Sequence, residues 1–144
     1  MVLKVKRLHP DAIIPKYAKT GDSGFDLVAI EDTVIAPTQT RLIKTGIAIE
    51  IPEGFEMQIR PRSGTSLNTQ LRVANAPGTV DSGFRGECCI ILQNTNIGGT
   101  IAIVKKGDRI AQGVICPVIH ATIEEVEDLT ETERGSSGFG SSGI

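Results

Sequence analysis

Short segments in which apolar and polar residues alternate recur along this chain. A period of two puts the apolar side chains of such a segment on one face of a β-strand. The clearest segments place apolar residues at Leu3 and Val5, at Ile47, Ile49 and Ile51, and at Phe55, Met57 and Ile59. Runs rich in β-branched residues predict further strands at 87–94, 100–104, 113–119 and 122–127. Gly and Pro turns separate these segments, so the pattern predicts an all-β sandwich or barrel of short strands.

Helical character is confined to one segment. Residues 63–71 (SGTSLNTQL) predict a single short helix, with Ser and Thr available to cap it. The last predicted strand ends near Val126. We therefore expect a β-sandwich core at 1–127 and a C-terminal arm at 128–144.

The arm ends in a tract of mostly Gly and Ser, RGSSGFGSSGI at 134–144. Such tracts are flexible, and one interpretation is a solvated, disordered terminus. The other is a tail that folds when a ligand arrives, with Arg134 holding an anion and Phe139 stacking on the ligand. This tract alone leaves both interpretations open.

Composition and charge exclude several classes of protein. With 144 residues, 40% hydrophobic and 22% charged, the chain is expected to form one globular domain. A net charge of −2 argues against general nucleic-acid binding, because that requires a basic face. We expect no membrane contact and a cytoplasmic location, because we find neither a signal peptide nor an apolar run of about 18 residues.

The segment RPRSGTS at 60–66 combines a cation with groups that bind phosphate. Arg62, the hydroxyl of Ser63 and the free amide of Gly64 stand at the predicted start of the helix, where unpaired N–H groups favour an anion. A strand-to-helix turn with solvated arginines explains the same residues equally well.

The segment NAPGTVDSGFRGE at 75–87 predicts a β-hairpin with Asp81 near its turn. Asp, Ser and Gly are ordinary turn residues, which is the simpler explanation. However, a carboxylate at Asp81, a ring at Phe84 and a cation at Arg85 fall within five residues. A tight hairpin can admit a flat base, read by backbone groups, while the ring packs on a sugar.

Two further segments hold candidate ligand-binding side chains. In KKGDRIAQ at 105–112, a turn leads into a strand, and Gln112 is the residue expected to face a ligand. In TGDSGFDL at 20–27, Asp26 is a candidate to orient an arginine or a hydrated metal ion, although turn and capping roles are equally ordinary for Asp22 and Asp26. The GxxxxGK[ST] phosphate loop is absent, which excludes a P-loop enzyme.

Taken together and in this order, the segments resemble the five motifs of the trimeric deoxyuridine triphosphatases (dUTPases). The motifs are DSGFDL, PRSG, GTVDSGFRG, GDRIAQ and RGSSGFGSSG, and they run from residue 22 to residue 143. The resemblance implies a jelly-roll-like β fold and a homotrimer whose active sites are shared between chains and closed by an arm that is mobile when empty. It also implies hydrolysis of dUTP to dUMP and pyrophosphate, which limits uracil in DNA and supplies dUMP for thymidylate synthesis.

The same resemblance implies roles for single residues. Asp81 falls where the family activates the attacking water, Phe84 where a ring packs under the deoxyribose and excludes ribose, and Asn75 where the uracil edge is read. The other implied substrate-binding positions are Arg62, Ser63, Gly64, Gly78, Val80, Gln112, Arg134, Phe139, Gly140, Ser141 and Ser142. The implied cofactor is one Mg²⁺ held by phosphate oxygens and water, with Asp26 as a candidate outer-shell contact.

Several positions depart from the family pattern. Phe84 replaces the commoner tyrosine, Gly83 stands where an acid is frequent, and Ser142 stands where threonine is frequent. Asp22 and Pro77 are also unusual at their positions. None removes a catalytic group, so they bear on affinity rather than on activity. The alternatives are a dCTP deaminase, which shares the fold family, and a catalytically silent β-sandwich.

Overall fold

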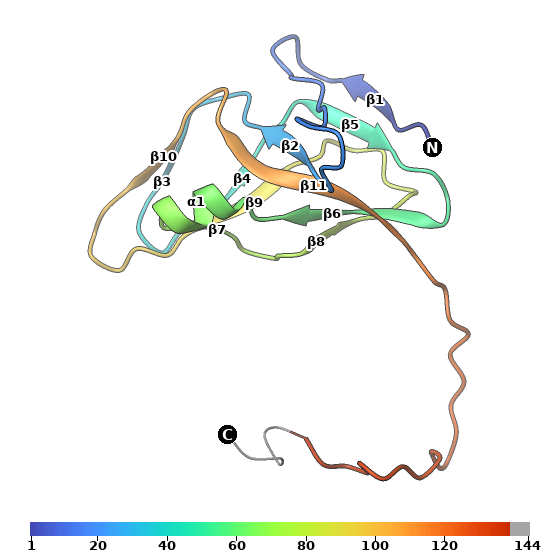
Figure 1. Cartoon of the computed structure of the whole chain (residues 1–144). Coiled ribbons are helices and arrows are strands. Elements are labelled where there is room, and N and C mark those ends of the chain that lie inside the picture. The colour runs from blue at the N-terminus through green and yellow to red at the C-terminus, as the bar shows by residue number, and fades with distance from the viewer. Residues whose placement is uncertain (139–144) are drawn as a thin grey trace.

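The computed structural model describes residues 1–138, and its regular structure is almost entirely β (Figure 1). The strands are β1 (Lys4–Arg7), β2 (Phe25–Val28), β3 (Thr33–Ile35), β4 (Thr40–Ile43), β5 (Ile47–Glu50), β6 (Phe55–Arg60), β7 (Leu71–Val73), β8 (Gly78–Val80), β9 (Ile90–Asn94), β10 (Ala102–Val104) and β11 (Arg109–Pro117). The one helix of the described part is α1 (Ser63–Asn68). The predicted all-β class with one short helix is confirmed.

The strands form four antiparallel sheets. The largest has the order β2-β11-β6-β8, and the second has the order β4-β9-β7. Two smaller sheets pair β1 with β5 and β10 with β3. Side chains from both larger sheets meet in one core cluster, which includes Leu27 and Met57 from the first sheet and Ile43, Ile90 and Leu92 from the second.

Aliphatic side chains dominate this core. Met57, Ile43 and Ile90 are 0% exposed, and burial of each such side chain stabilises the fold by about 1.5–3 kcal/mol. The alternation predicted for β6 is confirmed, because Met57 and Ile59 are buried and Phe55 packs against the core from its edge. The buried Asn94 amide is satisfied, since its Nδ2 donates to the carbonyl oxygens of Ile35 and Thr100 over 3.0 and 2.9 Å.

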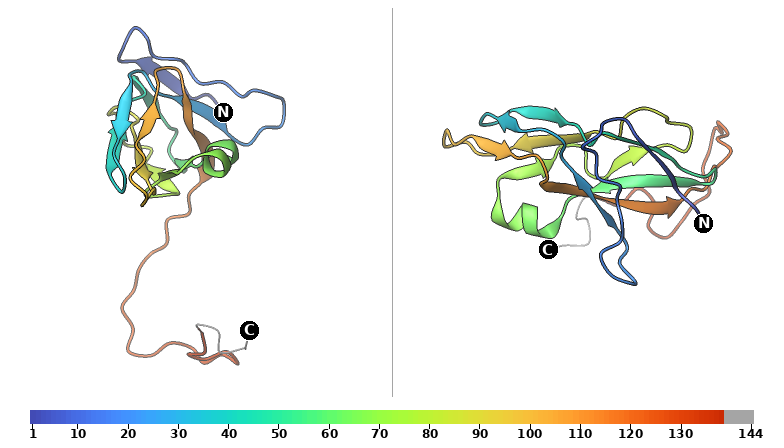
Figure 2. Two further views of the ribbon diagram at one scale, coloured as in Figure 1. Left: turned by 90° about the vertical axis from the view of Figure 1, so that its left-hand side faces the viewer. Right: turned by 90° about the horizontal axis from the view of Figure 1, so that it is seen from above.

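One predicted strand is absent. Residues 122–127 form no strand, and the last strand ends at Pro117. In residues 118–138, the backbone hydrogen bonds are the bond from Val118 N to Gly54 O (2.9 Å) and local bonds at 132–137. The alternating residues 122–127 therefore pair with no neighbouring strand. The left view of Figure 2 shows the chain leaving the body after β11.

Residues 75–87 do not form the predicted hairpin. Their one strand, β8, pairs with β6 through the register Ile59↔Gly78, and residues 81–89 form no strand. The turn that begins at Asp81 ends β8, but the chain after the turn forms no strand that pairs with β8. The predicted helix is shorter than expected, because Leu71 is drawn into the core as the first residue of β7.

Within residues 1–138, no helix has the length and apolar character needed to cross a membrane.

Candidate active site

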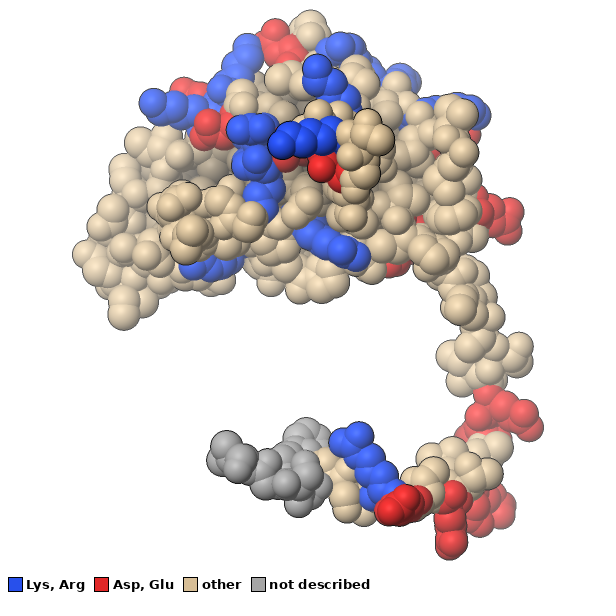
Figure 3. Space-filling model, in the orientation of Figure 1, with Lys and Arg blue, Asp and Glu red and all other residues tan. Residues whose placement is uncertain are grey.

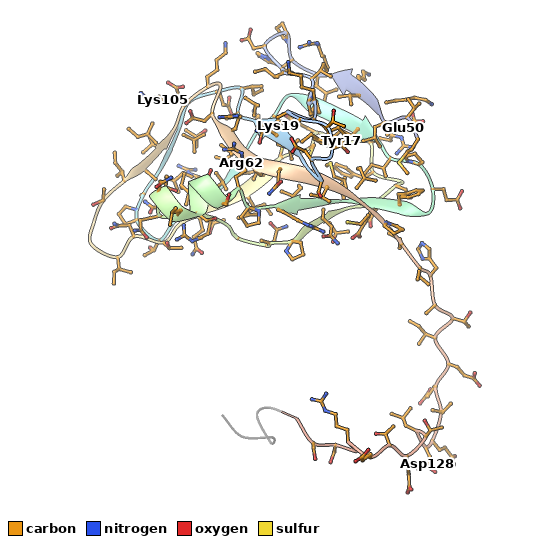
Figure 4. All side chains as sticks on the ribbon, in the orientation of Figure 1. Tyr17, Lys19, Glu50, Arg62, Lys105 and Asp128 are labelled. Carbon is orange, nitrogen blue, oxygen red and sulfur yellow. The ribbon has the colours of Figure 1, made fainter. Side chains whose placement is uncertain are left out.

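Residues from three separate segments line a pocket beside the start of α1. We call it the Arg62 pocket; its volume is about 330 Å³ and its lining residues are Ala18, Asp22, Ser23, Gly24, Asp26, Arg62, Ser63, Gly64, Arg109 and Gln112. Figure 4 shows Arg62 next to α1. The fold thus brings together Arg62, Ser63, Gly64 and Gln112, four of the predicted substrate-binding positions.

Arg62 is held by a carboxylate and a carbonyl group. Its Nε donates to Asp26 Oδ1 over 2.7 Å, and its Nη1 donates to the carbonyl oxygen of Arg109 over 3.3 Å. Arg109 Nη1 donates to the second oxygen of Asp26 over 3.4 Å. The side chains of Arg62 and Asp26 are 26% and 28% exposed, so water screens this pair less than a pair on the open surface. Two guanidinium groups share the Asp26 carboxylate, so these three side chains together carry a net positive charge, and the Asp22 carboxylate lines the same pocket.

The structure distinguishes the two aspartates of the segment 20–27. Asp26 orients Arg62, one of the roles considered for it. Asp22 closes its own turn, because its Oδ2 accepts a hydrogen bond from Lys19 N over 2.8 Å and its N–H donates to Lys19 O over 3.3 Å. The ordinary turn role therefore applies to Asp22.

Gln112 and the start of α1 also line the Arg62 pocket. Gln112 Nε2 donates to the carbonyl oxygen of Pro61 over 2.9 Å, which fixes the side chain between β11 and the helix. Arg62, not a Ser or Thr, occupies the N-cap position and makes no side-chain cap bond, so the predicted capping is wrong. The first-turn N–H groups at Ser63 and Gly64 have no acceptor within a helix.

The positions predicted to read base and sugar line a second pocket. We call it the Asp81 pocket; its volume is about 350 Å³ and its lining residues are Leu42, Ile59, Asn75, Gly78, Thr79, Val80, Asp81, Phe84, Glu87, Cys88, Cys89 and Ile91. Apolar side chains make up much of this wall. An exposed carboxylate at Asp81 therefore stands beside an apolar slot.

Two close approaches shape the Asp81 pocket. Phe84 N donates to Asp81 O over 3.1 Å, which closes a tight turn between the carboxylate and the ring. At Gly78, a Cβ would lie 3.0 Å from Asn75 Nδ2 and 3.3 Å from Ile59 Cβ. The glycine thus lets the Asn75 amide lie against β8; the intervening Ala76–Pro77 peptide bond is cis.

The two pockets lie on opposite faces of the four-stranded sheet. Gln112 is in register with Asp26, so these two side chains point to one face. The next residue, Gly113, is in register with Ile59, which is in register with Gly78, and this row points to the other face. The Arg62 pocket contains the first row, and the Asp81 pocket contains Ile59 and Gly78. Within a single chain, the Arg62 pocket and the Asp81 pocket are therefore two separate cavities.

Of the predicted tail residues, the structure describes Arg134, whereas Phe139, Gly140, Ser141 and Ser142 lie outside the described residues. Arg134 lies in a pair of tight turns. Gly135 N donates to Thr132 O (3.0 Å) and to Thr132 Oγ1 (3.1 Å), and Arg134 Nε donates to Ser137 O (3.0 Å). Figure 3 shows that the arm extends away from the body and that its charged side chains are mainly acidic.

The family model for dUTPases matches residues 10–143 of this chain. The chain belongs to the dUTPase family. It is 54% identical over 143 residues to the deoxyuridine 5'-triphosphate nucleotidohydrolase of Picosynechococcus sp., and the match covers 99% of each chain.

Solved dUTPase structures share the fold. The Staphylococcus bacteriophage 80alpha dUTPase with dUpNHpp has a TM-score of 0.90 and 31% identity, and the match covers 99% of each chain. A mutant dUTPase from phage phi11 of S. aureus, described with a structural Mg(II) ion, has a TM-score of 0.83 and 28% identity over 89% of this chain and 98% of that one. The predicted fold class thus agrees with known dUTPases.

Enzymes of the dUTPase family depend on metal, and the donor groups here bear on how a metal would be held. Within residues 1–138, no group of three or more His, Cys, Asp or Glu side chains is placed to hold a metal ion. The Arg62 pocket presents guanidinium, hydroxyl and amide donors, and its Asp26 carboxylate is engaged by two arginines. Such donors fit the phosphate oxygens of a metal–nucleotide complex better than a bare cation.

Sequence reasoning missed several lining residues of this dUTPase. Arg109 lies in the GDRIAQ motif together with Gln112, and this position in the motif could have indicated that Arg109 lines the same pocket. Leu42 and Ile91 face each other across β4 and β9, and nothing in the sequence indicates that this pair reaches the Asp81 pocket.

Two cysteines also belong to the wall of the Asp81 pocket. Burial above all raises the pKa of Cys88 to about 12, and it raises the pKa of Cys89 to about 11. Both thiols are therefore protonated near neutral pH and add no negative charge next to Asp81.

Proposed function

We propose that this chain hydrolyses dUTP to dUMP and pyrophosphate, which limits uracil in DNA and supplies dUMP for thymidylate synthesis. The observation that carries the proposal is the pair of pockets. One presents cations and amide donors suited to a triphosphate, and the other places the Asp81 carboxylate beside an apolar slot. The 54% identity to a deoxyuridine 5'-triphosphate nucleotidohydrolase supports the same activity.

We assign recognition of base and sugar to the Asp81 pocket. The Asn75 amide and the backbone at Gly78 and Val80 read the edge of uracil, and the Phe84 ring packs against the deoxyribose where a ribose would place its 2′-hydroxyl. The close packing of Asn75 on Gly78, where a Cβ would lie 3.0 Å from Asn75 Nδ2, supports a slot too narrow for the methyl group of thymine.

We assign the phosphates to the Arg62 pocket. The Arg62 guanidinium, the Ser63 hydroxyl, the Gly64 amide and Gln112 provide donors around the triphosphate. Asp26 orients Arg62 before a nucleotide is bound. Donors that are already oriented stabilise the charge of the transition state without reorganising during the reaction.

The arm at 128–144 closes the site in this proposal. Arg134 binds the γ-phosphate, the ring of Phe139 covers uracil, and Gly140, Ser141 and Ser142 wrap the γ-phosphate through their backbone amides. Closure excludes water and strengthens each charged contact, because it lowers the effective dielectric constant around the phosphates.

Asp81 acts as the general base. Its carboxylate orients a water molecule and takes a proton from it while the water oxygen forms a bond to the α-phosphorus. The bond from this phosphorus to the bridging oxygen breaks, and pyrophosphate leaves in line with the attack. A carboxylate is a weak base, so positioning of the water supplies much of the acceleration. A Mg²⁺ ion bound together with the nucleotide would neutralise part of the phosphate charge, and Asp26 is our candidate for a contact to the water shell of that ion.

Complete sites form between chains of a homotrimer in this proposal. The Arg62 and Asp81 pockets lie on opposite faces of one sheet, so a second chain is needed to bring one of each kind together. The segment between β11 and the arm also exposes apolar side chains, with Ile119 93% and Ile123 95% exposed, as expected of a segment that packs on another chain.

Incubation with dUTP and, separately, with dCTP tests the proposal, with pyrophosphate and ammonia as the products followed. We expect pyrophosphate from dUTP and no ammonia from dCTP. Ammonia from dCTP would indicate a deaminase. If neither pyrophosphate nor ammonia is formed, the chain is a catalytically silent β-sandwich.

A further inference from the structure

The ring of Phe84 rests with its tip on the backbone of Gly86. A Cβ built on Gly86 would lie 2.6 Å from Phe84 Cζ, 3.0 Å from Cε2 and 3.4 Å from Cε1. Non-bonded carbon atoms prefer separations of about 3.5–4.0 Å. The observed position of the Phe84 ring is therefore incompatible with a side chain at position 86. The remainder of the ring is accessible, since Phe84 is 46% exposed.

The backbone beneath the ring is tied to the core. Glu87 Oε1 accepts a hydrogen bond from Gly46 N over 2.7 Å, and Cys88 N donates to Ile47 O over 2.8 Å. Glu87 and Cys88, which make these bonds, directly follow Gly86 in the chain. Gly86 is therefore a fixed support for the ring.

The turn before Gly86 is closed by Arg85. Its Nη1 donates to Ser82 O over 2.6 Å and to Phe84 O over 3.0 Å, and Phe84 N donates to Asp81 O over 3.1 Å. The ring and the Asp81 carboxylate thus belong to one short turn whose end rests on Gly86.

Backbone conformation does not explain the glycine. The φ angle of Gly86 lies outside the left-handed region, in contrast to Gly46 at 68°, so alanine is compatible with the backbone there. The obstacle to a side chain at position 86 is the Phe84 ring itself.

We propose that Gly86 is a positioning residue for the Phe84 ring and thereby sets the preference of this site for deoxyribose over ribose. The inference deepens the proposed function and rests on it. Phe84 has no hydroxyl group that a hydrogen bond could hold, so its ring is placed by packing. Gly86 supplies the packing surface.

A comparison of Gly86→Ala with wild type tests the inference, with kcat/KM measured for dUTP and for UTP. The added methyl group displaces the ring tip by about 1 Å to restore ordinary carbon–carbon contact. We expect the ratio of the two constants to fall by at least about tenfold, because packing on the deoxyribose is lost while ribose is no longer excluded. Most of the loss for dUTP appears as a higher KM.

Gly83→Ala is the matched control in the same turn. A Cβ on Gly83 would meet nothing within 4 Å, and its φ also lies outside the left-handed region. Both kinetic constants should stay within about twofold of wild type.

The Phe84→Ala background separates ring positioning from general damage. In Phe84→Ala/Gly86→Ala, we expect no change in the dUTP/UTP ratio beyond that of Phe84→Ala, because the ring is gone. If Gly86→Ala alone unfolds, the double variant should fold, since it removes the clash.

An unchanged dUTP/UTP ratio of kcat/KM in folded Gly86→Ala would overturn the inference. The inference would also fail if Gly86→Ala lowered this ratio equally in the wild-type and Phe84→Ala backgrounds. The proposed function has a separate outcome. A wild-type chain without preference for dUTP would overturn both. A preference that disappears in Phe84→Ala but survives Gly86→Ala would overturn the inference alone.

Discussion

Asp26 and Asp81 carry the same side chain in different surroundings. The Asp26 carboxylate is bound by Arg62 over 2.7 Å and by Arg109 over 3.4 Å. Within residues 1–138, the structure shows no hydrogen-bond or ion-pair partner for the carboxylate of Asp81. A carboxylate whose oxygens are engaged orients its partners, whereas one whose oxygens are available can bind and activate water.

Asp81→Asn should abolish most of the activity and leave binding intact. The amide keeps the shape of the side chain but cannot take a proton, so we expect kcat to fall by about 10²–10⁴. Calorimetric titration with a non-hydrolysable dUTP analogue should give nearly the wild-type Kd. Turnover close to wild type would contradict the role of Asp81 as the base.

The buried thiol of Cys88 should make stability fall at alkaline pH. Its pKa is raised from 9.0 to about 12 in the folded chain, chiefly by burial. The folded chain therefore holds the proton more tightly, so this contribution is complete below about pH 9 and is lost as pH rises toward about 12.

The free energy of unfolding in urea, measured at about pH 8 and about pH 10, checks this prediction. The loss attributable to Cys88 is at most about 1.4 kcal/mol per pH unit above its unfolded pKa. Cys88→Ala should show a smaller drop between the two pH values than wild type. Equal drops in the two proteins would contradict it.

Among the elements, the arm is stabilised differently from the strands. Strands of the body exchange backbone bonds with neighbours far along the chain, as in the pairing of β11 with β6. The arm instead has local turns, in which Thr132 accepts from Gly135 N through both its carbonyl oxygen (3.0 Å) and its Oγ1 (3.1 Å). These turns order the backbone around Arg134 before a ligand is present.

Thr132→Val should weaken nucleotide binding with little effect on the chemical step. The valine has the same shape but lacks the hydroxyl, so the turn loses one hydrogen bond of about 1 kcal/mol. We expect KM for dUTP to rise by about fivefold and kcat to stay within about twofold. Thr132→Ser keeps the hydroxyl and should restore KM; a failure of serine to do so would show that the hydroxyl is not the relevant group.

For the molecule as a whole, the decisive feature is that its two pockets do not meet. Gln112 and Asp26 point to one face of the large sheet, and Ile59 and Gly78 point to the other. The arm leaves the body after β11 and extends away from it (Figure 1). Activity should therefore depend on assembly, with groups from different chains completing each site.

Mixing two inactive variants tests this dependence. One carries Asp81→Asn with an intact arm, and the other keeps Asp81 but is truncated before Arg134. After co-refolding, random assembly should make about one site in four complete, if the base and the arm come from different chains of a three-fold ring. Activity measured with dUTP should reappear.

Mixing without refolding is the control and should remain inactive. Co-refolded mixed trimers that form but hydrolyse no dUTP would contradict a site shared between chains.

The sequence determined the features that depend on neighbouring residues. Alternation at Met57 and Ile59 predicted a strand with a buried face, because side chains alternate along every strand whatever its partner. Turn residues marked where strands end. The five motifs, in fixed order over residues 22–143, indicated the family before any contact was known.

Only the tertiary structure decided which segments meet. Strand propensity at 122–127 was not enough, because a strand forms only where another offers its backbone, and those residues pair with none in the described chain. β8 pairs with β6 instead of closing a hairpin. The bond between Arg62 and Asp26 joins residues 36 positions apart, and the separation of the two pockets follows from which residues share a register across β2, β11, β6 and β8. A local pattern specifies the face of a strand, whereas long-range packing specifies what that face meets.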